Sequence, residues 1–407
     1  MSSDDAPESG QARDEAFLAD VVELLWPRGE SDPTAGSDSL VVLPSRRRPR
    51  VLVPAGARRA AVTALRTGSE QTSARARART IALAALFSVG LAELVFRDRL
   101  VVRSAPAADS VSAHLSAVLG RSLVVGVRLG PARANRKPVL QLLSPGGELV
   151  GFAKVGVNEL TNSLVAAEAR ALTQLATVTL ASVEVPQVLH LGEWRGLTVL
   201  VQSALPVRST RDSNPARGAQ AAMVTVATAL GERTHPVSAS PYLHRLRAAV
   251  ARLPEGAVRA ALRHGLDAVA ARPGSVLRFG CWHGDWTSGN MAVLPHRVLV
   301  WDWERFDADV PLGMDALHQC LLDLLTGDGR PAPAAVRHLV ERAPALLAPF
   351  GVPAEDVDAV VALYLIELGA RYLRDGQAQQ GPAFGQVDYW LLPAVAGLAE
   401  RLAGGPA

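Results

Sequence analysis

Cysteine is scarce in this chain of 407 residues, in which only Cys281 and Cys320 occur. So few thiols exclude a disulfide framework and a zinc site built on cysteine thiolates. Long hydrophobic runs are also missing. The longest run, residues 81–96, is shorter than the roughly 20 residues that cross a bilayer, and it contains Glu93. We therefore expect no transmembrane segment.

The beginning of the sequence lacks the pattern of a secretory signal. Residues 1–15 are acidic and rich in serine, with neither a basic n-region nor an apolar h-region. This composition predicts a disordered tail, and we expect a soluble, cytoplasmic protein. Because 49% of the residues are apolar and 20% are charged, the rest of the chain can form one large hydrophobic core or several smaller ones.

A strong excess of one charge sign is missing as well, because the formal net charge is only +3. The arginines are mostly dispersed along the chain, whereas nucleic-acid binding requires them to cluster on one face. We therefore expect no nucleic-acid partner. The basic segment Ser45–Arg50 is expected to be a solvated turn, and a weak contact with anionic lipid or phosphate is the alternative.

Lysine is nearly absent, since Lys137 and Lys154 are the only lysines among 42 basic residues. Lysine carries a compact point charge, whereas arginine carries a broad planar fork. Because arginine is accepted at every other basic position, the two lysines are candidates for a role that arginine cannot fill.

The chain divides into three regions after the tail. We predict an N-terminal accessory α/β region at 16–110, a small antiparallel β lobe at 111–205 and a larger helical lobe at 206–407. A β-rich island at 276–306 interrupts the helical lobe. The predicted fold class is therefore α+β with two lobes, and a ligand is expected in the cleft of such an architecture.

Hydrophobic periodicity and turn signals locate the individual elements. The small lobe is predicted to have five antiparallel strands with one inserted helix. The predicted strands are 40–43, 51–53, 122–129, 138–143, 149–155, 188–191 and 197–201, and the predicted helices include 159–175, 241–253, 257–271, 315–325, 334–347, 354–374 and 387–402.

The β-rich island carries the most specific motif of the chain. A loop between two predicted strands contains His283, Asp285 and Asn290 in the pattern His-x-Asp-x4-Asn, and Asp302 follows the next apolar strand. Phosphoryl transfer uses these residue types, because a carboxylate accepts the hydroxyl proton and oxygen ligands hold the Mg²⁺ that bridges the phosphates. The spacing therefore indicates a phosphotransferase.

The stretch from His283 to Asp315 resembles the aminoglycoside phosphotransferase and choline kinase family, which has a protein-kinase-like fold. The resemblance implies that Asp285 is the catalytic base and that Asn290 and Asp302 hold magnesium. It also implies that Asp315 braces the catalytic loop, with a simple helix N-cap as the alternative. For His283 it implies a structural hydrogen-bonding role.

The same family places a phosphate-binding lysine on the third strand of the small lobe and a glutamate on the following helix. Lys154 lies at this place, after a Pro-Gly-Gly turn. Glu168 lies on an apolar stripe of the predicted helix, where a carboxylate is costly unless a cation meets it. The resemblance therefore implies that Glu168 orients Lys154, and Glu159 is the alternative partner.

Two further segments are assigned to the nucleotide by resemblance alone. The loop Gly130–Lys137 is implied to cover the phosphates through Arg136 or Lys137, although it has only one glycine, and a solvated hairpin tip is the alternative. Gln202 and Ala204, at the end of the last small-lobe strand, are implied to offer backbone groups to adenine.

We interpret the chain as an ATP- and Mg²⁺-dependent phosphotransferase that acts on a hydroxyl of a small molecule, such as an amino sugar, a sugar, an amino alcohol or an antibiotic. A catalytically silent pseudokinase that serves as a binding or assembly module is the alternative from a different class. The large N-terminal region that the resemblance does not cover keeps this alternative open. Gly289 is a separate departure, because the family commonly has a bulky residue there. A protein kinase is disfavoured, since the segment from Asp302 to Asp315 is too short for an activation loop. A metal-dependent hydrolase is disfavoured because no further ligand lies nearby.

The acceptor site stays open at the level of sequence. One group of acidic residues would suit a cationic amino sugar, although its Glu367 could instead pair with Arg371 along a helix. One group of aromatic residues would stack on a sugar or lie in the core. The acidic group is Asp307, Asp309, Asp323 and Glu367, and the aromatic group is Trp286, Trp303, Tyr364 and Tyr372.

Overall fold

The computed structural model describes residues 5–27, 37–67, 74–103, 109–131, 133–207, 215–327, 329–376 and 387–404. The chain forms two compact units. The first consists of Met1–Ala166 and Gln187–Arg208, and the second of Ala167–Pro186 and Ser209–Ala407. Helix α6 (Glu159–Leu175) contributes residues to both units.

One eight-stranded antiparallel sheet forms the centre of the first unit. Five of its strands and the inserted helix α6 confirm the pattern predicted for the small lobe. The strands are β1 (Ser37–Ser45), β2 (Arg48–Pro54), β3 (Arg99–Arg103), β4 (Val124–Leu129), β5 (Pro138–Leu143), β6 (Leu149–Val155), β8 (Val188–Trp194) and β9 (Leu197–Ser203), in the order β3-β1-β2-β4-β5-β6-β9-β8.

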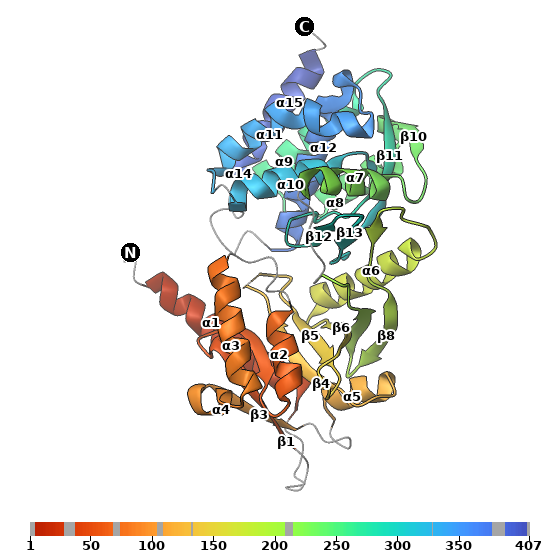
Figure 1. The fold of residues 1–407 in the computed structure, drawn as a ribbon. Helices are drawn as coiled ribbons and strands as arrows, with labels where there is room; N and C mark the ends of the chain where they lie inside the picture. Colours follow the sequence, from red (N-terminus) through yellow and green to blue (C-terminus); the bar gives the residue numbers. More distant parts are fainter. Residues whose placement is uncertain are drawn as a thin grey trace. The chain divides into compact units, whose positions relative to one another are not determined.

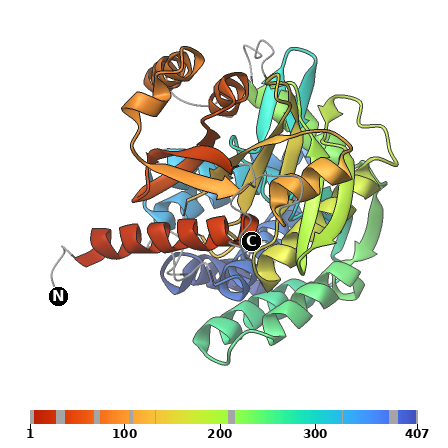
Figure 2. The ribbon, with the colours of Figure 1, turned by 90° about the horizontal axis from the view of Figure 1, so that it is seen from below.

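Residues 16–110, which we predicted as an accessory α/β region, share one sheet with the small lobe. Strand β2 pairs with β4 through Val51 and Arg128, so the N-terminal strands extend the sheet of the small lobe. The predicted disordered tail is wrong from Asp5 onward, because helix α1 spans Asp5–Leu25. It lies along strand β2 (Figure 2). The other helices before α6 are α2 (Arg58–Arg66), α3 (Ala74–Ser88), α4 (Ala92–Val95) and α5 (Val111–Val118).

Both faces of the N-terminal part of the sheet are covered, and this explains its uninterrupted apolar runs. Side chains of a strand alternate between faces. In β1, Leu40 and Val42 pack with residues of α1, whereas Val41 and Leu43 pack with residues of α2 and α3. Helices α2 and α3 lie side by side (Figure 1). The β1–β2 turn exposes Arg46 and Arg47, as predicted for a solvated turn.

The second unit is mainly helical and contains two three-stranded sheets, β10-β11-β14 and β12-β13-β7. The β-rich island is confirmed, whereas α7, β7 and β10 are absent from the sequence-based prediction. The helices are α7 (Pro215–Ala227), α8 (Pro241–Ala251), α9 (Ala257–Ala270), α10 (Met314–Leu322), α11 (Ala332–Leu347), α12 (Val357–Arg374), α14 (Val387–Trp390) and α15 (Leu392–Gly404). The strands are β7 (Val183–Glu184), β10 (Arg233–Pro236), β11 (Val276–Trp282), β12 (Met291–Leu294), β13 (Arg297–Val300) and β14 (Asp307–Pro311).

Helix α12 is the central helix of this unit and packs against α9 and α15. Nearly all of its side chains are buried, which accounts for its apolar sequence on every face. Helix α8 begins where Ser240 accepts a hydrogen bond from the Leu243 N–H and Pro241 occupies the first turn. Among the described helices, none has the length and apolar character that crossing a membrane requires.

The β12–β13 hairpin positions the motif residues of the island. Its register pairs Met291 with Val300, so the residue before β12 and the residues after β13 lie at the same end. The Trp301 N–H donates to the Asn290 carbonyl at 3.0 Å. Asn290 and Asp302, far apart in the motif, therefore become neighbours. The fold as a whole confirms the predicted α+β class, with a β-sheet unit and a larger helical unit.

Candidate active site

Asp315 fixes the loop that carries the His-Gly-Asp sequence. Its Oδ2 accepts the His283 N–H at 2.7 Å, and its Oδ1 accepts the Gly284 N–H at 3.0 Å. Asp315 is only 4% exposed, and this burial raises the pKa of its carboxyl against the opposing effect of its hydrogen-bond donors. The bracing role is therefore confirmed. The N-cap alternative is wrong, because the N-cap of α10 is Gly313.

His283 is held by the backbone at both ring nitrogens. The Asp285 N–H approaches Nδ1 at 3.2 Å, and the Trp301 carbonyl lies 3.0 Å from Nε2. An N–H group only donates and a carbonyl only accepts, so Nδ1 is unprotonated and Nε2 carries the hydrogen. The ring is fully buried and lies edge-on to Trp303 at 4.6 Å. The predicted structural role of His283 is confirmed.

The Asp285 carboxylate has a separate partner for each oxygen. Oδ2 accepts a hydrogen bond from Asn290 Nδ2 at 3.0 Å, and Oδ1 lies 3.3 Å from His318 Nε2. Desolvation raises the pKa of Asp285, but the hydrogen bond from His318 and the charge of Arg371 outweigh it, so the pKa lies below its usual range. Asp285 is therefore an ionised base at neutral pH.

Asn290 and Asp302 supply oxygen atoms beside this base. Because Asn290 Nδ2 donates to both Oδ2 and the main-chain oxygen of Asp285, its Oδ1 is the atom left to bind a cation. Asp302 has a φ of 72°, in the left-handed region that non-glycine residues rarely adopt. Such conformations cluster at functional sites.

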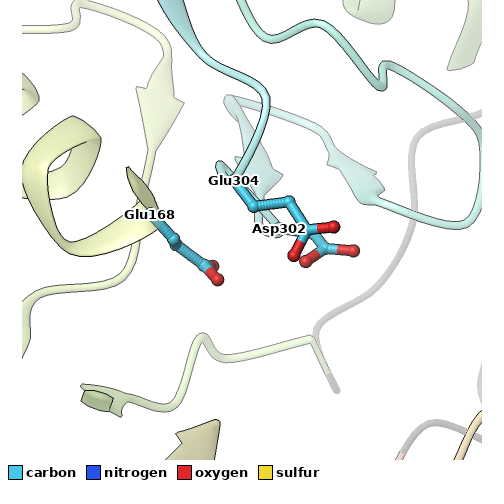
Figure 3. A group of neighbouring side chains, drawn as sticks. All are labelled: Glu168, Asp302 and Glu304. Atoms are coloured by element: carbon cyan, nitrogen blue, oxygen red, sulfur yellow. The ribbon is translucent and has the colours of Figure 1, made fainter. Parts of the chain in front are cut away.

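Three carboxylates, those of Glu168, Asp302 and Glu304, point into one space (Figure 3). One oxygen from each lies within 4.8 Å of the other two. Glu168 and Glu304 are 0% and 6% exposed, and like charges so placed repel one another. A hard divalent cation offsets this repulsion, and carboxylate oxygens are the ligands that Mg²⁺ prefers. The donor set therefore fits magnesium, with Glu304 as a contributor that the sequence analysis left without a role.

Glu168 has a second contact in the same unit, because its Oε1 accepts the Trp303 N–H at 3.3 Å. Lys154, its predicted partner, lies on β6 opposite Val139 and Leu200 and is 5% exposed. Since Lys154 and Glu168 belong to different units, their pairing stays a prediction.

The other residues assigned to the nucleotide all belong to the first unit. Gly130 lies directly after β4 and Lys137 directly before β5. Gln202 lies within β9, in register with both neighbouring strands, whereas Ala204 follows the end of that strand. Because the main chain of Gln202 pairs with strands on both sides, Ala204 is the better candidate for a backbone contact with a nucleotide base.

The predicted solvated hairpin tip is wrong for Arg136 and Lys137, which are 8% and 9% exposed. Arg136 Nη1 donates to Asp14 Oδ1 at 2.7 Å, and its guanidinium lies 4.0 Å from the centre of the Phe17 ring. Arg136 therefore ties the loop to helix α1. A contact between Lys137 and phosphate stays a prediction, and Arg133 is a further cation of the same loop.

The candidate acceptor residues are mostly engaged within the protein. Arg245 pairs with Asp307 and Asp309 at 3.2 and 3.3 Å. Burial raises the pKa of Glu367, which accepts a hydrogen bond from Tyr242 at 3.5 Å, while Arg371 donates to the Gly284 carbonyl. The predicted aromatic group lies in the core rather than on a surface: Trp286, Trp303, Tyr364 and Tyr372 are at most 5% exposed.

Comparisons with known proteins yield structural likenesses alone. No family model and no curated protein matches the chain. A thermostable aminoglycoside phosphotransferase shares 14% identity and has a TM-score of 0.46, and the match covers 73% of this chain and all of that one. A macrolide 2′-phosphotransferase from Brachybacterium faecium shares 15% identity and has a TM-score of 0.38, and the match covers 72% of this chain and 98% of that one. A choline/ethanolamine kinase family protein from Mesorhizobium loti shares 15% identity and has a TM-score of 0.37, and the match covers 69% of this chain and 87% of that one.

These neighbours are small-molecule phosphotransferases and include both classes that the sequence motif resembles. Identities and TM-scores of this size do not assign an activity. The function proposed below therefore rests on the side chains of this chain.

Proposed function

We propose that the protein is an ATP- and Mg²⁺-dependent phosphotransferase that moves the γ-phosphoryl group to a hydroxyl of a small molecule. One observation carries the proposal: the Asp285 carboxylate accepts a hydrogen bond from Asn290, next to the end of the hairpin that Asp302 follows. These are the residue types that phosphoryl transfer needs, a proton acceptor and oxygen ligands for a hard cation.

In this function Asp285 orients the acceptor hydroxyl and takes its proton while the hydroxyl oxygen bonds to the γ-phosphorus. The bond between that phosphorus and the ADP oxygen breaks, so ADP leaves. Asn290 Oδ1 and the Asp302 carboxylate would hold magnesium, with Glu304 beside them. The bound cation would neutralise the phosphate charge. Positioning and charge stabilisation supply most of the acceleration in such a reaction.

The first unit would hold the nucleotide. Lys154, as a buried point charge, would meet the phosphates, with Glu168 as its counter-charge. The loop Gly130–Lys137 would cover the phosphates through Lys137, and the main chain at Ala204 would meet adenine. The cytoplasm is the proposed location, because ATP and Mg²⁺ are available there.

The hydrogen bonds that hold the loop of Asp285 favour an active enzyme over a silent pseudokinase. Asp315 and His283 hold the loop through four hydrogen bonds, and the pKa of Asp285 lies below its usual range. A module that binds without turnover would not require an ionised base beside its cation ligands.

The test is an ATP-consumption screen of the full chain against amino sugars, sugars, amino alcohols and hydroxylated antibiotics. Each compound is assayed with Mg²⁺ and, as the matched control, with the metal chelated. We expect Mg²⁺-dependent consumption with at least one class, accompanied by a phosphorylated product. Binding of Mg²⁺·ATP with no product from any class would favour the pseudokinase, and the absence of binding would overturn both.

A further inference from the structure

A buried histidine outside the sequence motif contacts the proposed base. His318 lies on α10 and is 1% exposed. Its Nε2 lies 3.3 Å from Asp285 Oδ1, and its Nδ1 lies 3.1 Å from the hydroxyl oxygen of Tyr364 on α12. The three side chains form a continuous line within the second unit.

The protonation states follow from burial. Tyr364 is fully buried, and its pKa is raised well above the usual value, first because of burial, so it keeps its hydrogen. Burial also lowers the pKa of His318 despite the opposing hydrogen bond to Asp285, so the imidazole is neutral and carries one N–H.

The direction of the hydrogen bonds is then determined. An ionised carboxylate can only accept, so the single imidazole hydrogen must be on His318 Nε2 to reach Asp285 Oδ1. The bare Nδ1 accepts the hydrogen of the Tyr364 hydroxyl. The partner of one ring nitrogen thus fixes which form the other presents.

We propose that His318 is a positioning residue for phosphoryl transfer, oriented by Tyr364, that holds the Asp285 carboxylate in its reactive orientation. The inference rests on the proposed function. Asn290 holds Oδ2 and His318 holds Oδ1, so the carboxylate cannot rotate without losing a hydrogen bond. His318 acts through Asp285 and does not itself touch the substrate. A misplacement of about 1 Å at a reacting group can cost on the order of 10²-fold in rate.

Two substitutions separate positioning from simple packing. In His318→Gln the amide nitrogen reaches about as far as Nε2 and can still donate to Asp285. In His318→Asn the shorter amide reaches about as far as Nδ1, so the donation to Asp285 is lost. Both variants bury an amide in place of an imidazole, so their stabilities are comparable. His338→Asn, on α11 at a partly exposed position, is the matched control for the chemical change.

The readout is Mg²⁺·ATP hydrolysis by the full chain, in which water replaces the hydroxyl acceptor and no substrate needs to be known. We expect His318→Asn to lower kcat by roughly 10²-fold with an unchanged KM for ATP, and His318→Gln to stay within about tenfold of the wild type. We expect Tyr364→Phe to fall between the two, and His338→Asn to match the wild type. Equal losses of kcat in the Gln and Asn variants would overturn the positioning role.

A second readout is independent of turnover. ¹⁵N NMR of the imidazole should show His318 as a neutral ring with its hydrogen on Nε2, in the wild type and in Tyr364→Phe alike, because the Asp285 carboxylate accepts that hydrogen in both. A charged ring, or a hydrogen on Nδ1 in the wild type, would contradict the proposal. If the wild type transfers no phosphate while His318 has the expected form, the proposed function is wrong, but the hydrogen bonds that join Asp285, His318 and Tyr364 are still supported.

Discussion

At the scale of single residues, two backbone positions decide the shape of the candidate site. Gly284 has a φ of 80° and Asp302 a φ of 72°, both in the left-handed region. A Cβ added at Gly284 would lie 2.4 Å from the Arg305 carbonyl oxygen, so glycine is required both by conformation and by space. Gly289 differs, since the nearest atom to an added Cβ there is Thr287 Oγ1 at 3.5 Å.

Gly284→Ala should therefore destabilise the second unit and displace Asp285. We expect the free energy of unfolding to fall by about 1–3 kcal/mol. We also expect most of the ATP turnover to be lost. Gly289→Ala is the matched control and should leave both within experimental error. Denaturant unfolding and ATP turnover of the two variants check this, and similar effects at both positions would show that Gly284 has no special role.

Asp302→Asn separates the metal role of this side chain from its structural role. Asparagine tolerates the left-handed region and has nearly the same shape. It removes one charge from the carboxylate group with Glu168 and Glu304. We expect a melting temperature that is unchanged or higher without metal, and the loss of the increase that Mg²⁺·ATP gives the wild type. A drop in melting temperature without metal would mean that Asp302 is structural.

The sequence was sufficient to select candidate site residues that lie in one short motif, such as Asp285, Asn290 and Asp302. Their residue types and spacing carry the chemistry directly. His318 was not predicted, because its only signal is a contact with a side chain 33 positions away on another element. A lone histidine in an apolar helix has no local pattern that distinguishes a positioning residue from a packed one.

At the scale of elements, strands with clear turn signals were predicted well, and β5 and helix α6 have the predicted bounds. Helix α1 was missed because its first turns are acidic and polar, and because its apolar side chains form a core only together with the strands of the sheet. The union of the N-terminal strands with the small lobe depends on pairing between Val51 and Arg128. No local pattern encodes such a long-range pairing.

The contact between α1 and the loop before β5 gives a prediction for these elements. The side chains of Asp14 and Arg136 are 10% and 5% exposed. Asp14→Asn would leave the buried guanidinium without a counter-charge, so we expect a loss of roughly 3–5 kcal/mol in the free energy of unfolding. Asp358→Asn, which breaks the more exposed pair with Arg401, should cost less than about 1 kcal/mol. Equal costs in denaturant unfolding would show that α1 is only loosely attached.

At the scale of the whole molecule, the buried His318 makes folding stability depend on pH. The pKa of His318 is lowered by burial, so below its ordinary value of 6.5 the unfolded chain binds a proton that the folded chain refuses. The stability is present above pH 6.5 and is lost as the pH falls. We expect the wild type to lose more stability than His318→Gln between pH 7.5 and pH 5.5 in thermal unfolding. Parallel curves would contradict a neutral His318.

The central claim is that Asp285 is the base of a phosphotransferase. The most direct measurement follows transfer of the ³²P-labelled γ-phosphoryl group of ATP to hydroxyl compounds by the wild type, by Asp285→Asn and by Asp388→Asn at an exposed control position. We expect labelled product from the wild type and from the control. We expect Asp285→Asn to lose roughly 10²-fold or more of the product, with unchanged affinity for Mg²⁺·ATP. Equal product from Asp285→Asn and the wild type would contradict the role of Asp285 as the base.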